Sequence, residues 1–392
     1  MPTRRHLLHA AAVTAFGAAR AARVFAARYD LLIRGGRVVD PAGRRDGVAD
    51  VAISQGRIAA VGRDLPLAEA AAVLDARGRI VTPGLVDIHV HIDGEMPPAH
   101  CLSTGVTALC DGGSRGADNV GELLRLAAAA PNQVRLLLNL GRTGLGATGE
   151  LLDLANADVA AARRVVDAHP GVIVGIKARL SRNAAGVHDL DAVRRAHAIT
   201  VPTKLSLMVH IGQTVSPLPA ILALLRPGDI VTHMYAPPPH GMLDTDGRVL
   251  PEVREARARG ILFDVGNGRS GHFTWDVAER ALQQDFLPDT ISSDLTAPGR
   301  SDRVFDFPTV LSKFLMLGMP LDQVIARATV NAARALPPFR AVGTLEVGAA
   351  ADVAVFELRD GAFEFVDNDR TPRAGRQLLV PVAVVVRGQQ LV

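Results

Sequence analysis

The chain has 392 residues, of which 48% are hydrophobic and 21% charged, and its formal net charge is only +3. This is the composition of a globular protein large enough for one or two domains, and it excludes a fibrous or disordered chain. No block rich in Lys and Arg occurs, so we expect no nucleic-acid partner. The two cysteines, Cys101 and Cys110, lack the spacing of a metal site, so we interpret them as packed thiols.

The first 28 residues differ from the rest of the chain. Residues 3–8, TRRHLL, resemble a twin-arginine export signal, and the Ala-rich run Ala10–Ala19 offers a weak apolar region after it. Arg20 and Arg23 count against a signal, so the alternative is a disordered or mis-started N-terminus. We expect a periplasmic location if the segment is a working signal and a cytoplasmic one otherwise. No later apolar run reaches membrane-spanning length, so we expect a soluble mature protein with no membrane partner.

Short strands separated by turn residues run from Tyr29 to Val81, which is the pattern of a small antiparallel unit. The expected strands are Asp30–Gly35, Arg37–Asp40, Asp50–Ser54, Arg57–Gly62 and Ala72–Arg77. The other end of the chain has the same pattern at Ala351–Glu357 and Val380–Arg387. We therefore predict one β-sandwich assembled from both termini, residues 29–82 and 340–392.

Between these two segments, apolar β-rich runs alternate with amphipathic or Ala/Leu-rich helical segments. The expected strands are Leu85–His89, Val106–Asp111, Val134–Leu140, Val172–Lys177, Leu207–Ile211, Ile230–His233, Ile261–Val265 and Thr290–Asp294. Buried strands with crossover helices in this number are typical of an α/β fold of the (β/α)8, or TIM, barrel type, which we place at residues 83–339. A doubly wound open sheet is the alternative.

The first strand of this series ends in a His-x-His pair. Because side chains alternate along a strand, His89 and His91 point to the same side. Two like-facing imidazoles at the end of a buried strand are either half of a metal site or a pair of hydrogen-bonded core histidines. This pair alone does not decide between the two interpretations.

The carboxyl ends of the other expected strands favour a shared site. In a (β/α)8 barrel the active site is built at these ends, and this chain places there Lys177, His210, His233 and Asp294. Taken singly, the histidines are compatible with buried structural residues, and Asp294 with a helix cap. Lys177 is the most unusual, because burying an ammonium costs much free energy unless the side chain reaches solvent. The joint pattern is far more specific than any one member.

With these residues the chain resembles the amidohydrolase superfamily of metal-dependent hydrolases, from Tyr29 to Val392. The resemblance rests on a Pro-Gly-(apolar)-Asp-x-His-x-His motif that ends at His91, on the strand-end Lys, His, His and Asp, and on the closing motif Gly343–Gly348 with Ala351-Asp352-Val353. Residues 175–179, GIKAR, resemble the amidohydrolase/deacetylase, or dihydroorotase-like, subgroup. The resemblance implies a hydrolase acting on C–N bonds other than peptide bonds, or on ester bonds.

The resemblance also implies a site for two divalent metal ions, with Zn²⁺ as the first choice. The ligands it implies are His89, His91, Lys177, His210, His233 and Asp294. The first two histidines and the aspartate would hold one ion, and the other two histidines the second. Lys177 would bridge both as a carbamate formed with CO₂, because a carbamate offers two anionic oxygens. A metal-bridging hydroxide would attack the scissile carbonyl, with Asp294 as general base and then general acid.

Two further side chains are candidates for contact with substrate. Arg179 lies two residues beyond Lys177 and would suit a substrate carboxylate, or it is a solvated loop arginine. His272 is a weaker candidate, because it lies in the glycine-rich segment Gly266–Phe273, which an ordinary flexible loop would explain. The subgroup suggests a small carboxylate-bearing acyl substrate, such as an N-acetyl amino acid or an O-acetyl hydroxy acid. We also expect a homo-oligomer.

Three other functions stay open at this point. A cyclic-amide hydrolase of the dihydroorotase or hydantoinase type normally has a polar or basic residue soon after His-x-His, where this chain has residues 92–95, IDGE. A mononuclear deaminase would need a glutamate two residues after His210, where Gly212 stands. A dinucleotide-binding oxidoreductase would use Gly144–Gly149, which match G-x-G-x-x-G with Asp167 further on, but it would leave the strand-end residues unexplained.

Overall fold

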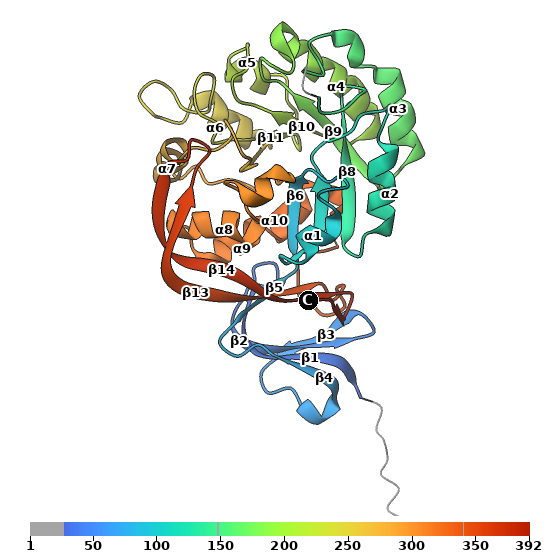
Figure 1. Ribbon diagram of the computed structural model, residues 1–392, viewed down its shortest axis with the longest axis vertical. Helices are drawn as coiled ribbons and strands as arrows, with labels where there is room; N and C mark the ends of the chain where they lie inside the picture. The colour runs from blue at the N-terminus through green and yellow to red at the C-terminus, as the bar shows by residue number, and fades with distance from the viewer. Residues whose placement is uncertain (1–26, 147–148, 340) are drawn as a thin grey trace, which may run out of the picture.

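The computed structural model describes residues 27–146, 149–339 and 341–392. The expected twin-arginine signal, residues 1–28, lies outside these ranges except for its last two positions. The described residues form two parts: a parallel sheet with its helices, and a second sheet to which both ends of the described chain contribute (Figure 1). None of the described helices has the length and apolar character needed to cross a membrane.

The parallel sheet has seven strands in the order β12-β11-β10-β9-β8-β7-β6. Their bounds are β6 Leu85–Val90, β7 Val106–Asp111, β8 Gln133–Asn139, β9 Ile173–Arg179, β10 Ser206–His210, β11 Ile230–Thr232 and β12 Leu262–Asp264. Every residue of β6 and β7 is buried, as expected for parallel strands covered on both faces. Seven of the eight strands expected from sequence are therefore present, with ends shifted by about two residues or less.

The eighth expected strand, Thr290–Asp294, is not a strand in the structure. Thr290 forms an isolated parallel bridge with Asp264 at the end of β12, and Leu295 forms one with Val90 at the end of β6. Asp294 has a φ of 49°, in the left-handed region, which interrupts an extended conformation. The segment therefore spans the gap between the last and first strands without a continuous ladder, so the curled sheet is only partly the barrel that we expected.

Helices follow most of the strands and lie around the sheet (Figure 1). They are α1 Pro98–Leu102, α2 Gly121–Ala129, α3 Val159–Ala168, α4 Asp189–Thr203, α5 Leu218–Leu222, α6 Pro251–Ala258, α7 Trp275–Gln283, α8 Phe307–Met316, α9 Leu321–Arg327 and α10 Val330–Ala335. Their apolar faces and the outer faces of the strands form one large buried cluster. The carboxyl ends of β6 to β12 thus lie together at one end of a rigid scaffold.

The second sheet has eight strands, β15-β14-β13-β5-β1-β2-β3, with β4 paired to β1. Their bounds are β1 Tyr29–Asp40, β2 Arg45–Ser54, β3 Arg57–Gly62, β4 Ala70–Asp75, β5 Ile80–Pro83, β13 Val353–Val366, β14 Pro372–Val386 and β15 Gln389–Gln390. The strands from the beginning of the described chain join those from its end where Val355 on β13 pairs with Val81 on β5. The hydrogen bonds join all eight strands into one sheet, whereas we expected a sandwich of two.

The hairpin of β13 and β14 is much longer than the sequence predicted. We expected strands only at Ala351–Glu357 and Val380–Arg387. In the structure β13 continues to Val366, and β14 already begins at Pro372. This hairpin rises from the second sheet along the outside of the barrel as far as α7 (Figure 1). On its way it packs on α8, where the backbone N–H of Leu379 donates to Ser312 Oγ at 2.9 Å.

Candidate metal centre and substrate cavity

The strand ends bring the six candidate ligands together. His89 lies within β6, Lys177 within β9 and His210 at the last position of β10, and the other three lie directly after strands or in the closing segment. Lys177 Nζ is 2.9 Å from His89 Nε2, and the His210 and His233 ring centres are 4.1 Å apart. The rings of His89 and His233 are 5.2 Å apart, which links the two groups of histidines. Residues from separate segments of the chain thus surround one point.

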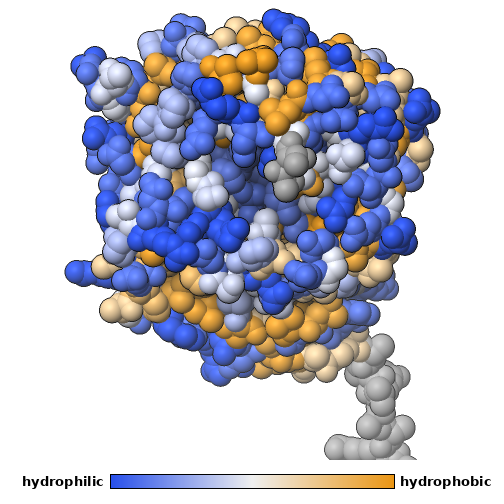
Figure 2. Space-filling model, turned by 45° about the horizontal axis from the view of Figure 1, so that its top comes forward, coloured by the Kyte–Doolittle hydropathy of each residue, from blue (hydrophilic) through white to orange (hydrophobic). Residues whose placement is uncertain are grey.

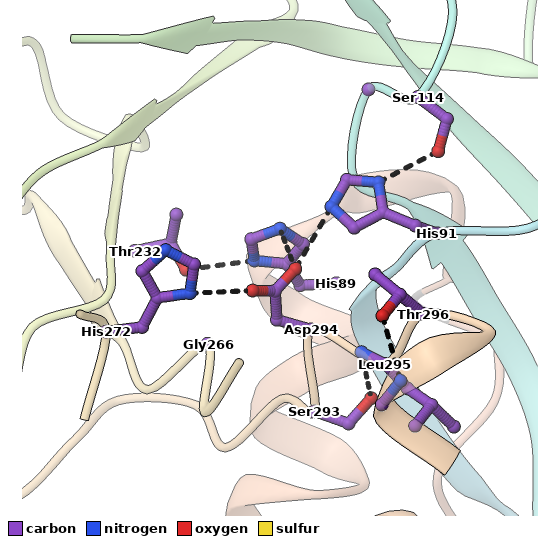
Figure 3. Close-up of polar contacts among 12 residues, drawn as sticks. His89, His91, Ser114, Thr232, Gly266, His272, Ser293, Asp294, Leu295 and Thr296 are labelled. Atoms are coloured by element: carbon purple, nitrogen blue, oxygen red, sulfur yellow. Dashed lines mark hydrogen bonds and ion pairs between the residues drawn. The ribbon is translucent and has the colours of Figure 1, made fainter. Parts of the chain in front are cut away.

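Asp294 lies against the first pair of histidines. Its Oδ1 is 3.0 Å from His91 Nε2 and 3.4 Å from His89 Nε2 (Figure 3). Ligand atoms about 2.0–2.1 Å from a tetrahedral Zn²⁺ lie roughly 3.3 Å from one another. The observed separations of 3.0 and 3.4 Å lie close to this value.

Two relays of hydrogen bonds determine which nitrogen of each of these histidines carries the proton. The Thr232 hydroxyl donates to Asp264 Oδ2 at 2.7 Å, so the His89 Nδ1–H must be the donor to Thr232 Oγ1, 3.0 Å away. In the same way the Ser114 hydroxyl donates to Asp111 Oδ2 at 2.7 Å and accepts from His91 Nδ1–H at 2.8 Å. Both Nε2 atoms are left as lone-pair donors, the form that binds a metal.

His233 shows the same arrangement by a different route. Its Nδ1–H donates to the carbonyl of Gly266 at 2.7 Å, and its Nε2 is buried without a hydrogen-bond partner among the described residues. An unpaired buried lone pair costs free energy unless something binds it. His233 and Asp294 also have left-handed backbones, with φ of 67° and 49°, and strain of this kind is concentrated at functional sites. The donor set therefore fits a metal ion.

The ionisation of the site also suits metal ligands. Burial and, after it, the nearby charge of Lys177 together lower the pKa of His89 to about 4, so this ring is neutral at pH 7. Burial lowers the pKa of Lys177 to about 8, which makes a fraction of its amine neutral near physiological pH. Burial opposes the ionisation of Asp294, but the imidazoles of His89, His272 and His91 outweigh it and hold the pKa of this carboxyl well below its usual range.

His272, a weak candidate from sequence, lies inside the site. Its Nδ1 is 3.0 Å from Asp294 Oδ2 (Figure 3). Its ring stacks on that of His233, with ring centres 3.9 Å apart. Among the described residues the Nδ1 has no hydrogen-bond partner, so the contact with Asp294 is one of proximity. His210, His233 and His272 have ligand atoms close enough to share an ion, as do His89, His233 and Asp294. His272 is thus in reach of both the carboxylate and a metal.

A cavity of about 190 Å³ opens beside these residues. It is lined by His91, Leu145, Lys177, Arg179, Arg269, Ser270, His210, His272, Asp294 and Thr296. Figure 2, in which the top of the molecule comes forward, shows a hollow on this face bordered mainly by hydrophilic residues. The cavity is smaller than the roughly 300–1,000 Å³ of sites for drug-sized ligands, which favours a small substrate.

Arg179 lines this cavity, but it already has a partner. Its Nε and Nη2 donate to the two oxygens of Glu150 at 2.9 and 3.1 Å, and the Glu150 side chain is fully buried. The guanidinium keeps its remaining N–H groups for another acceptor. Arg179 is therefore neither a solvated loop arginine nor a guanidinium wholly free for a substrate carboxylate. The buried carboxylate of Glu150 orients it at the edge of the cavity.

Several residues of the site were not singled out from sequence. The hydroxyl–carboxylate pairs Ser114–Asp111 and Thr232–Asp264, the Arg179 partner Glu150 and the second cavity arginine Arg269 belong to this group. Arg269 lies in the glycine-rich segment that we had noted. The aspartate of the His-x-His motif, Asp87, accepts from Ser293 Oγ at 2.5 Å and from the His89 backbone N–H at 3.2 Å, and so ties the strand to the segment of Asp294.

Comparisons with known proteins agree with this geometry. Residues 270–390 match the family model described as the amidohydrolase family. A protein of Enterococcus faecalis named deacetylase is 30% identical over 371 residues, which cover 92% of this chain and 98% of the relative. The crystal structure of an adenine deaminase (TM-score 0.85, 30% identity) covers 92% of this chain and 99% of that one. The crystal structure of a dihydroorotase (TM-score 0.82, 29% identity) covers 92% and 98%.

These relatives share the fold over nearly the whole chain, but their names differ in substrate. The two solved structures share the scaffold, as their TM-scores show. The protein is a hydrolase and belongs to the amidohydrolase family.

Proposed function

We propose that the protein is a binuclear metal-dependent deacetylase that hydrolyses an acyl ester or amide of a small carboxylate-bearing molecule. The observation that carries the proposal is the buried amine of Lys177 at 2.9 Å from His89 Nε2, among imidazoles whose Nδ1 atoms are engaged elsewhere. Similarity to a named deacetylase over nearly the whole chain supports it.

The candidate ligands divide into two sets. His89, His91 and Asp294 would hold one ion, and His210 and His233 the other. The neutral amine of Lys177 would add CO₂ to form a carbamate with release of one proton, and the carbamate would supply two anionic oxygens as further ligands. When bound, the ions polarise the scissile carbonyl and make a water nucleophilic near neutral pH, for which Zn²⁺ is well suited.

Asp294 is placed to move the proton. Its Oδ1 faces the two histidines, and its Oδ2 faces His272 and the cavity. Because its pKa lies well below the usual range, the carboxylate is ionised at neutral pH and can accept a proton from the attacking water. The same group then gives the proton to the leaving alcohol or amine. His272 would stabilise the carboxylate in this exchange and contact the substrate.

The residues at the mouth of the cavity support the proposed substrate class. Arg179 and Arg269 both line it, and a guanidinium oriented by a buried glutamate suits a substrate carboxylate. The small volume suits an acetyl group on a short acid. N-acetyl amino acids and O-acetyl hydroxy acids meet both conditions.

Two alternatives within the family are less well supported. A cyclic-amide hydrolase would normally have a polar or basic residue soon after His-x-His, where this chain has the fully buried Ile92 followed by an acidic residue, Asp93, and no basic one up to residue 95. A mononuclear deaminase would lack its glutamate, since Gly212 stands two residues after His210 with a φ of 111° that disfavours any side chain. The binuclear deacetylase uses every strand-end residue.

The test is a metal analysis followed by a substrate panel. Protein expressed with bicarbonate should contain about two equivalents of zinc, and it should hydrolyse N-acetyl amino acids or O-acetyl hydroxy acids but neither adenine nor dihydroorotate. One metal equivalent together with ammonia release from adenine would instead establish the deaminase.

Three further expectations stay predictions. Light scattering would measure homo-oligomerisation, and limited proteolysis would test the domain limits 29–82, 83–339 and 340–392. Cell fractionation would test export through the N-terminal segment.

A further inference from the structure

The turn of the long hairpin contacts the loop that carries His272. This turn, residues 367–371, joins β13 and β14 and belongs to the second sheet, far along the chain from the loop that follows β12. The backbone N–H of Asn368 donates to the carbonyl of Phe273 at 3.0 Å. A part of the molecule outside the parallel sheet therefore reaches the candidate catalytic site.

The side chain of Asn368 uses its entire hydrogen-bonding capacity on this loop. Its Oδ1 accepts from the backbone N–H groups of His272 and Phe273 at 2.8 and 3.1 Å. Its Nδ2 donates to the carbonyls of Asn267 and Gly268 at 3.2 and 3.0 Å. Asn368 is buried, so none of these four bonds competes with bulk water. One amide group thus joins the beginning of the loop to its end.

A second set of bonds fixes the residue at which the loop enters α7. The Trp275 backbone N–H donates to Asp367 Oδ2 at 3.2 Å, and its indole Nε1–H donates to the carbonyl of Thr371 at 2.7 Å. The other oxygen of Asp367 accepts from the backbone N–H groups of Asp369 and Thr371, which orients the carboxylate. The turn is therefore itself rigid and can act as a support.

The loop needs such support because of its backbone. Gly266, Gly268 and Gly271 all have left-handed φ values, of 48°, 55° and 70°. Glycine adopts this conformation easily but loses much conformational entropy when it is fixed. At Gly268 a Cβ would also overlap His272 and the Asp294 carboxylate, so a stiffer residue is not available there. External hydrogen bonds must supply the order that the glycines do not.

We propose that Asn368 is the positioning residue of the active site, which holds the His272 imidazole against Asp294 and the face of His233. Asn368 does not line the substrate cavity, and among the cavity-lining residues it bonds only to the backbone of His272, so it acts through the loop backbone. Its effect on catalysis rests on the proposed function, in which Asp294 moves the proton, whereas its effect on loop order does not.

The test compares three variants of the full-length protein. Asn368→Ala removes all four bonds, and Asn368→Asp keeps the shape and both acceptor bonds but sets an oxygen against the carbonyls of Asn267 and Gly268. Asp369→Ala, at the exposed neighbouring position, is the matched control. Trp275 is the only tryptophan in the sequence, so its fluorescence reports directly on the docked turn.

Two readouts judge the proposal. In both Asn368 variants, amide hydrogen exchange of residues 266–275 and acrylamide quenching of Trp275 should increase, while Asp369→Ala should match the wild type. The kcat should fall about 30- to 100-fold, with KM changed less than about threefold, because a displacement on the order of 1 Å of His272, beside the proton-transfer carboxylate, slows chemistry more than binding.

Each remaining outcome decides against part or all of this inference. Unchanged exchange in the loop would overturn the support itself, whatever the activity. Faster exchange with wild-type kcat would overturn the positioning role. If the wild type hydrolyses nothing in the acyl panel, the proposed function fails separately, and the exchange and quenching data alone still decide whether Asn368 orders the loop.

Discussion

The candidate ligands fall into two groups that the fold holds in different ways. Lys177 and His210 lie in neighbouring strands, β9 and β10, whose register places Lys177 opposite Met208 and His210 opposite Arg179. Asp294 and His272 lie outside any strand, and the structure fixes them by left-handed backbone and by side chains from elsewhere. The backbone hydrogen bonds between strands fix the positions of the first group, whereas the positions of the second group depend on individual side chains.

This difference indicates which parts of the site can tolerate substitutions nearby. A ligand in a strand keeps its position when a neighbouring side chain is replaced, because many backbone hydrogen bonds hold the strand in place. A loop-borne residue loses its position when a single amide or carboxylate is removed. The predictions below probe the two groups and the supports between them, beginning with the largest expected effect.

Removing the strand-borne lysine should have the largest effect. Lys177→Ala deletes the proposed bridge between the ions, so we expect kcat/KM to fall by at least about 1,000-fold and the metal content to drop. Short-chain carboxylates such as acetate or propionate should restore part of the activity. The exposed Lys204, at the end of α4, offers the control Lys204→Ala. Wild-type activity with full metal content in Lys177→Ala would contradict the assignment.

Changing the cavity arginine should have the next largest effect, on binding. Arg179→Lys keeps a positive charge beside the buried Glu150 but loses the planar, bidentate geometry. We expect KM for an acetylated acid to rise about 10- to 100-fold with little change in kcat. The measurement is steady-state kinetics with the acid and with its methyl ester. An equal loss on both substrates would show that Arg179 does not recognise the carboxylate.

Breaking one hydroxyl relay should weaken metal binding more moderately. Thr232→Val removes the acceptor of the His89 Nδ1–H bond, and we expect metal affinity to fall about 10- to 100-fold in a chelator competition. Thr290→Val is the matched control, because Thr290 also donates to Asp264, at 2.7 Å, without contacting a histidine. Equal losses in both variants would assign the effect to Asp264 alone.

The smallest effect concerns a lysine beneath the loop of His272 and is one of stability. Lys313 is buried, its Nζ donates to Asn267 Oδ1 at 3.1 Å, and burial lowers its pKa to about 7 from a usual value of 10.5. Between these two pH values the unfolded chain binds more protons than the folded one, so stability rises with pH and is lost as pH falls towards 7. Lys313→Met removes this dependence.

The free energy of unfolding of the wild type, relative to Lys313→Met, should therefore increase on the order of 3 kcal/mol between pH 7 and about pH 9.5. Urea unfolding of both proteins at the two pH values measures it. The subtraction cancels groups that both proteins share. Parallel pH profiles would mean that the amine is charged or unburied in the folded state.

The strand-borne half of the site could be predicted from sequence, and the reason is physical. Alternation along a strand fixes the common direction of His89 and His91, and an apolar run that ends in Lys177 has few explanations. Arg179 and its cavity position followed from the same strand. These inferences need only the local chain, because neighbouring strands align by themselves.

The remainder depends on contacts between distant residues, which local patterns do not show. Thr290–Asp294 has the composition of a strand, but left-handed Asp294 and its bonds to β6 override that preference. The polar middle of the hairpin gave no strand signal, because its partner is α8 rather than a second sheet face. Glu150 and Asn368 lack any motif, since each acts through a partner far along the chain.

The path of the hairpin also limits how this protein can be divided. A fragment that ended before residue 350 would contain every proposed ligand, yet it would expose β5 as an unpaired edge and free the segment of His272. The parallel sheet should therefore not be treated as an independent module. Truncation, or grafting of its residues onto another scaffold, should yield a protein that binds metal but has a low kcat. On the inference drawn above, the extension after the last helix contributes to the active site as well as to the second sheet.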